Sequence, residues 1–69
     1  MDISTKIKLA MAYAGIKEAE LARRLGTSPQ AFGQRMKNGL FSVAELETIA
    51  IALGAEYNNF FQFSDGQKI

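Results

Sequence analysis

The 69-residue sequence contains no cysteine, no histidine and no tryptophan, and it has a single proline. Without cysteine, disulfide bonds and thiolate metal sites are excluded. Without histidine, the chain lacks the usual general base and the most common metal ligand. No apolar run approaches the roughly 20 residues that a membrane span requires, and the N-terminus lacks the basic and then apolar pattern of a secretion signal. We therefore expect a cytoplasmic protein with no metal, no cofactor and no membrane partner.

Enzymatic function is also not expected. The acidic pairs Glu18 with Glu20 and Glu45 with Glu47 are each two residues apart in helical segments, so their carboxylates do not converge on one site. No glycine-rich phosphate loop and no metal-ligand cluster is present. Hydrophobic residues make up 48% of the chain, which argues against disorder. We expect one folded domain over residues 1–69.

Charge is distributed unevenly along the chain. Residues 1–40 hold seven basic and three acidic residues, a net charge of +4, whereas residues 41–69 hold one basic and four acidic residues, a net charge of −3. Between Arg23 and Lys37 there is no acidic residue at all. This polarity suits a protein that turns one face toward a polyanion.

The first half of the chain predicts two helices, from Ile3 to Ala14 and from Lys17 to Leu25. Glycine follows each stretch, as is common where a helix ends in a left-handed residue. Apolar residues recur at helical spacing on one side of each stretch. Those expected to face inward are Ile3, Ile7, Ala10, Met11 and Ala14 in the first, and Leu21, Ala22 and Leu25 in the second.

Two further helices begin at clear capping patterns. Ser28-Pro29 combines a preferred N-cap with proline at the first helical position, and Ser42-Val43-Ala44-Glu45 is a capping box. In the third helix Phe32 and Met36 are expected to face the core. In the fourth, which should end at Gly54, the buried stripe is expected to contain Val43, Leu46, Ile49, Ala50 and Leu53.

The C-terminal segment after Gly54 is aromatic and has two possible structures. Phe61 and Phe63 are in period-2 register and precede Asp65-Gly66, a favoured pair for a tight turn, which predicts a short β-hairpin. A short fifth helix from Asn58 to Gln62 is the alternative. The predicted fold is therefore all-α, a compact bundle of four to five helices, with either ending.

The segment from Glu18 to Lys37 has the composition of a helix-turn-helix. Small Ala22 allows two helices to approach closely, Gly26 supplies the turn, and Leu21, Leu25 and Phe32 join the pair to the rest of the domain. The stretch from Gly15 to Ser28, and the pattern from Ser42 to Gly54, resemble the phage repressor and Cro-type (XRE-type) transcriptional regulators. The resemblance covers about Ile3 to Gly54. It implies a helical bundle that binds operator-like double-stranded DNA, usually as a dimer, and regulates transcription, most often as a repressor.

The third helix is the predicted reading element. Opposite its apolar side it presents Gln30, Ala31 and Gln34, and the two glutamines are four residues apart on one face. Glutamine can pair with N6 and N7 of adenine, and alanine can contact the methyl group of thymine. The matching positions of the resembling family read bases. We expect phosphate contacts, which set the register without reading sequence, from Lys17, Ser28, Arg35, Lys37 and Asn38.

The chain departs from the family pattern at several positions. Lys17 and Glu18 stand where the family often has a threonine or serine cap and a glutamine that contacts phosphate, and a carboxylate at Glu18 repels phosphate. Pro29 stands where some members carry another base-reading side chain. Gly33 costs the third helix about 1 kcal/mol relative to alanine, which indicates either a close approach at that point or a pliable helix.

Two further expectations concern partners. A single small DNA-binding domain buries a modest area on DNA, so we expect a homodimer. The segment from Tyr57 to Phe63 is the available interface. The alternative function is a protein-interaction module on the same scaffold, either antitoxin-like or an accessory domain of a regulator. Arg23 and Arg24, in the last turn of the second helix, are expected mainly to complement its C-terminal dipole.

Overall fold

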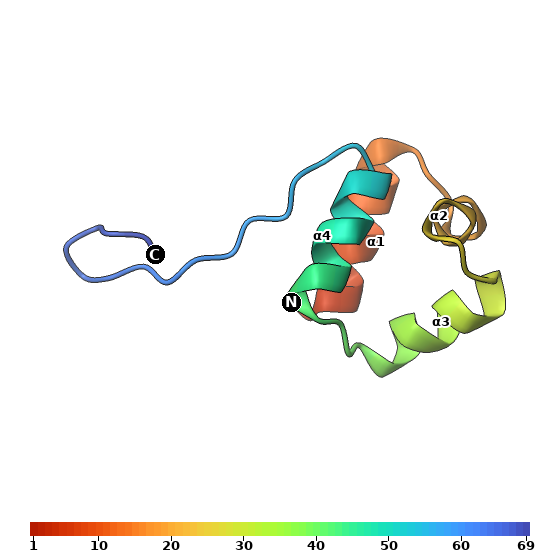
Figure 1. Ribbon diagram of the computed structural model, residues 1–69, viewed down its shortest axis with the longest axis horizontal. Helices are drawn as coiled ribbons and strands as arrows, with labels where there is room; N and C mark the ends of the chain where they lie inside the picture. Colours follow the sequence, from red (N-terminus) through yellow and green to blue (C-terminus); the bar gives the residue numbers. More distant parts are fainter.

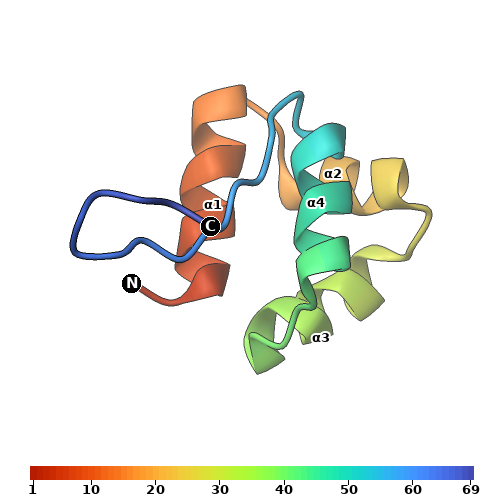
Figure 2. The ribbon, with the colours of Figure 1, turned by 60° about the vertical axis from the view of Figure 1, so that its left-hand side comes forward.

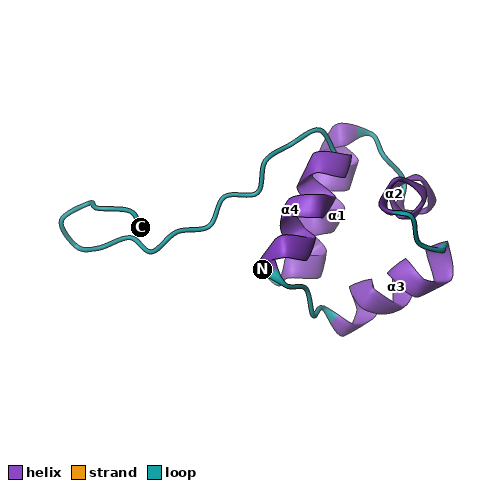
Figure 3. Ribbon diagram, viewed as in Figure 1, coloured by secondary structure: helices purple, strands orange, loops and turns teal.

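The computed structural model describes residues 1–69 and contains four α-helices and no β-strand (Figure 3). The helices are α1 (Ile3–Ala14), α2 (Glu18–Leu25), α3 (Pro29–Asn38) and α4 (Val43–Ala52). Helices α1 and α4 run alongside each other, while α2 and α3 close the other side of the bundle (Figures 1 and 2). The predicted all-α class is confirmed, with four helices. None of these helices is long and apolar enough to cross a membrane.

The helix ends follow the capping residues of the sequence. Asp2 Oδ1 accepts from the N–H of Thr5 at 2.8 Å, and Ser28 Oγ accepts from the N–H of Ala31 at 3.1 Å. Ser42 and Glu45 form the complete capping box at the start of α4. Helices α1, α2 and α3 each end at a glycine with φ near +70°, a conformation that costs other residues energy.

The core consists of nine buried side chains, all of them apolar. Leu21 and Ala22 of α2 are completely inaccessible, and α2 packs against both α3 and α4. The remaining buried residues are Ile7, Met11, Phe32, Met36, Leu46, Ile49 and Ala50. Three residues predicted to face inward are instead exposed, namely Ala10, Ala14 and Val43. Ala14 and Val43 are end residues of their helices, and Ala10 lines an open groove between α1 and α4, so no neighbouring helix covers them completely.

Two polar contacts join helix ends that are distant in the sequence. Ser4 Oγ, in the first turn of α1, donates to the carbonyl of Met36 near the end of α3 at 2.7 Å. Arg24 Nη1, in the last turn of α2, donates to the carbonyl of Ala52 at the end of α4 at 2.9 Å. Each contact satisfies a C-terminal carbonyl that has no partner within its own helix.

The predicted C-terminal β-hairpin and the alternative fifth helix are both absent. The chain leaves α4 and extends away from the bundle (Figure 1), and a single antiparallel bridge joins Gln62 and Lys68 around the turn at Gly66. All residues from 58 to 69 are exposed. A two-stranded hairpin is marginal when it has no surface to pack on, so the Asp65-Gly66 turn forms without the strands on either side.

Candidate nucleic-acid interface

The exposed side of α3 is the side that the sequence predicted to read DNA. Phe32 and Met36 point into the core, and Gln30 and Gln34 are exposed on the opposite side. Gln34 Nε2 lies 3.4 Å from Asn38 Oδ1, so the amide of Gln34 is loosely oriented along the helix. Ser28 caps the helix at its N-terminus. Polar side chains therefore occur along this side of α3 from its start to its end.

A depression of about 420 Å³ borders this surface on the side of α1 and α2. From α3 it is lined by Gln30, Gly33, Gln34 and Lys37 at helical spacing, together with Met36. Lys8 of α1 and Glu18 of α2 complete the lining. The depression thus brings both glutamines and Lys37 together, as predicted, and adds Lys8 and Glu18, which the sequence did not assign to the interface.

Glu18 reaches this depression from α2 and lies over Gly33 of α3. The Oε2 atom of Glu18 lies 3.8 Å from the position that a Cβ at residue 33 would occupy. This is ordinary van der Waals range, so the contact leaves room for a methyl group at residue 33 and close approach does not require glycine there.

Lys17 lies at the N-cap of α2 and is exposed, but its side chain makes no capping hydrogen bond. The first N–H groups of α2 therefore have no side-chain partner at the cap. Glu18 and Glu20, in the first turn, complement the positive end of the helix dipole. Lys17 contributes charge near the interface without lining the depression.

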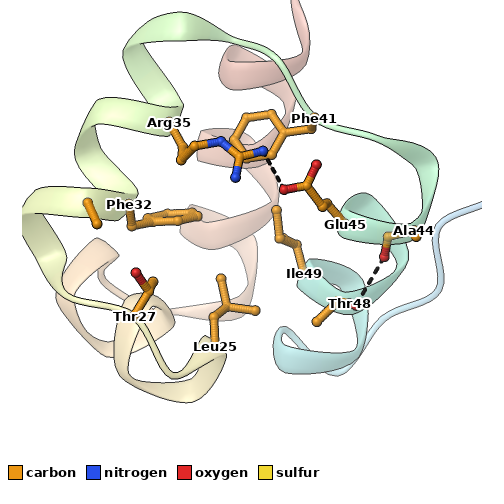
Figure 4. Close-up of a pocket in the computed structure, with 10 residues that line it drawn as sticks. Leu25, Thr27, Phe32, Arg35, Phe41, Ala44, Glu45, Thr48 and Ile49 are labelled. Atoms are coloured by element: carbon orange, nitrogen blue, oxygen red, sulfur yellow. Dashed lines mark hydrogen bonds and ion pairs between the residues drawn. The ribbon is translucent and has the colours of Figure 1, made fainter.

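Arg35 lies on the other flank of α3, facing α4 (Figure 4). It lines a groove of about 460 Å³ together with Ala31, Phe32, Phe41, Ile49 and residues of α2 and α4. Ala31 is exposed at the edge of this groove. The two flanks of α3 are therefore different: one is polar and faces α1 and α2, and the other is largely apolar and faces α4.

The guanidinium group of Arg35 is held by three partners. It forms an ion pair with Glu45, donates to the carbonyl of Leu40 at 2.9 Å, and lies 5.2 Å from the centroid of the Phe41 ring. Glu45 also accepts from the N–H of Ser42 at 2.8 Å, and the hydrogen bonds from Ser42 and Arg35 lower the pKa of its carboxyl. Arg35 thus joins α3 to the start of α4, and its predicted phosphate contact stays a prediction that competes with these partners.

The arginines of α2 are also engaged within the protein. Glu20 Oε1 accepts from Nε of Arg23 at 2.9 Å, and Glu20 Oε2 accepts from Nε of Arg24 at 2.8 Å. These hydrogen bonds, that from Arg23 first, lower the pKa of Glu20 from 4.5 to about 2. Both arginines lie in the last turn of α2, where a positive charge is favourable, as the sequence predicted.

Comparison of the chain with protein-family models, with curated proteins and with solved structures gave no significant match.

Proposed function

We propose that the protein is a sequence-specific regulator that binds double-stranded DNA, of the phage repressor or Cro type. In this proposal α2 and α3 form a helix-turn-helix, and α3 enters the major groove. The observation that carries it is the pair Gln30 and Gln34, exposed one turn apart on the side of α3 opposite the buried Phe32 and Met36. A short helix with such a face, joined to the preceding helix by three residues, has the shape of a recognition helix.

Each polar residue of the surface has a role in this proposal. Gln30 and Gln34 each pair with adenine through N6 and N7, and Ala31 contacts a thymine methyl group. Lys17, Ser28, Lys37 and Asn38 contact phosphates and fix the position of α3 on the duplex. Lys8, which borders the same depression, adds positive charge beside Lys37. Arg35 holds the angle of α3 relative to α4.

We further propose that the protein acts as a cytoplasmic homodimer, joined through its C-terminal segment. Phe60, Phe61 and Phe63 are all more than half exposed, which is unfavourable for a segment that is always in water. The backbone of this segment is hydrogen-bonded to itself around the turn, through Phe61 with Ile69 and Phe63 with Gln67, so in this proposal the exposed aromatic side chains form the contact with a second copy. A two-fold dimer would place two copies of α3 on successive major-groove half-sites.

The test is selection of bound duplexes from a random pool, followed by affinity measurements on the selected site. Lys37→Glu should weaken binding to all duplexes and lower the slope of log affinity against log salt by about one or more. Gln34→Ala should cost about 1–3 kcal/mol on the selected site and relax preference at one position. Lys6→Glu is the matched charge control, because Lys6 borders the groove between α1 and α4. Absence of binding to any duplex, or binding that is insensitive to salt, would contradict the proposal.

A second candidate is a protein-interaction module, antitoxin-like or accessory to a regulator. The observation that favours it is the largely apolar groove between α3 and α4, which is open to solvent (Figure 4). In that case Lys37→Glu and Gln34→Ala leave partner binding unchanged, since neither residue lines the groove. A substitution within the groove, such as Ala44→Arg, should then abolish it.

A further inference from the structure

The polar stripe of α3 has a gap that α2 fills. Gln30, Gly33, Gln34 and Lys37 succeed one another along one side of α3, and Gly33 contributes no side chain. The carboxylate of Glu18 lies over this glycine, with Oε2 in ordinary van der Waals range of the missing Cβ position. The depression therefore presents an amide, a carboxylate, an amide and an ammonium group, and the carboxylate comes from a different helix.

The carboxylate of Glu18 has no partner within the protein, unlike the carboxylates of Glu20 and Glu45. Glu20 is held by two arginines, and Glu45 is held by Arg35 and the N–H of Ser42. Glu18 is half-buried, yet it takes part in no ion pair and no side-chain hydrogen bond. Its hydrogen-bonding capacity is thus free for a partner outside the protein.

The depression also contains positive charge, which reduces the repulsion between this carboxylate and the phosphates of DNA. Lys8 and Lys37 line it together with Glu18, so its local net charge is positive. An ionised carboxylate only accepts hydrogen bonds. In the major groove, N4–H₂ of cytosine is a donor that carboxylates pair with, whereas the N6–H₂ of adenine lies beside the acceptor N7, which repels a carboxylate.

We propose that Glu18 is a specificity-determining residue that accepts a hydrogen bond from N4 of a cytosine, next to the bases contacted by Gln30 and Gln34. The inference rests on the proposed function, since it names a base that the same surface reads. Glu18 then acts in two ways. It stabilises binding to cytosine by accepting a hydrogen bond, and it repels the acceptor edges of guanine and thymine at that position.

The test compares base preference at every position of the selected half-site for wild type, Glu18→Gln, Glu18→Asp and Glu47→Gln. Glutamine removes the charge and favours adenine, and aspartate keeps the charge but withdraws the carboxylate by one methylene group. We expect wild type to prefer cytosine at one position by about tenfold or more, and both Glu18 variants to lose this preference. Glu47→Gln, which removes the same charge from the exposed side of α4, should retain it.

The outcomes separate this inference from the proposed function. If wild type selects no duplex, the proposed function fails and the role of Glu18 fails with it. If wild type selects a site but Glu18→Gln tightens binding to all duplexes by the same factor, Glu18 only repels phosphate and the inference alone is wrong. The same holds if Glu18→Asp keeps the cytosine preference. Urea unfolding of each variant verifies that the compared proteins are folded.

Discussion

Replacing Gly33 with alanine should stabilise the protein. Gly33 lies in the interior of α3, and its φ is not in the left-handed region, so alanine can adopt the same backbone conformation. Alanine in a helix interior is favoured over glycine by about 0.8–1.0 kcal/mol, chiefly because the unfolded chain has fewer conformations to lose. The new methyl group meets only Glu18 Oε2, at 3.8 Å, so no steric cost offsets this gain.

The gain should be measurable by urea unfolding, followed by circular dichroism at a wavelength that reports helix. About 0.8 kcal/mol corresponds to a rise in Tm of about 5 °C for a chain of this length. Gly26→Ala is the matched control. An added methyl group there meets no atom within 4 Å, but the φ of Gly26 is +75°, so the substitution should destabilise by about 1–2 kcal/mol.

A neutral or destabilising effect of Gly33→Ala would refute the reasoning, because it would mean that residue 33 is packed more closely than this structure allows. The substitution also bears on Glu18. Since the methyl group fits beside Oε2 without a clash, Gly33→Ala should leave the cytosine preference of the selected site unchanged, whereas a bulkier side chain at residue 33 should displace the carboxylate.

Three other predictions concern caps, pH and the C-terminal segment. Ser42→Ala removes the acceptor for the N–H of Glu45 and should cost about 1 kcal/mol in urea unfolding, while Ser42→Asp, which keeps an acceptor, should cost less. The pKa of Glu20 is lowered from 4.5 to about 2 in the folded protein, so its stabilisation is complete above about pH 4.5 and is lost as the pH falls through about 2. In Glu20→Gln, Tm should therefore decrease less steeply as the pH falls over that range. If the decrease is the same as in wild type, other carboxylates cause it. Deleting residues 58–69 should convert the proposed dimer to a monomer in sedimentation velocity, and a dimer that persists would place the interface elsewhere.

The helix boundaries could be predicted because they depend on local chemistry. Asp2, Ser28 and Ser42 accept hydrogen bonds within the first turn of their own helices. Gly15 and Gly26 end helices because of their own backbone freedom. Such effects involve residues three or four apart, so they are present in the sequence pattern itself. Only the extent of the buried stripes was overestimated, since coverage depends on how closely neighbouring helices approach.

The contacts between helices could not be predicted from these patterns. Spacing placed Gln30 and Gln34 on the exposed side of α3, where they lie, but it gave no indication that Glu18 would cross Gly33. The ion pair of Arg35 with Glu45 likewise depends on the path of the chain between α3 and α4. In the C-terminal segment the turn residues acted as expected, and the strands failed to form because they have no surface to pack on.

The central position of α2 has a consequence for the motions of the protein. Helices of fewer than about 12 residues are marginal on their own, and α2 has only eight, so it persists because Leu21 and Ala22 are completely buried. The hydrogen-bonded amides of α2, which begin at Leu21, should therefore exchange with solvent only when the whole domain opens. Exchange at Ala22 would then report the global free energy of unfolding, and a bound duplex would slow that exchange by a factor of one plus the ratio of free duplex concentration to Kd.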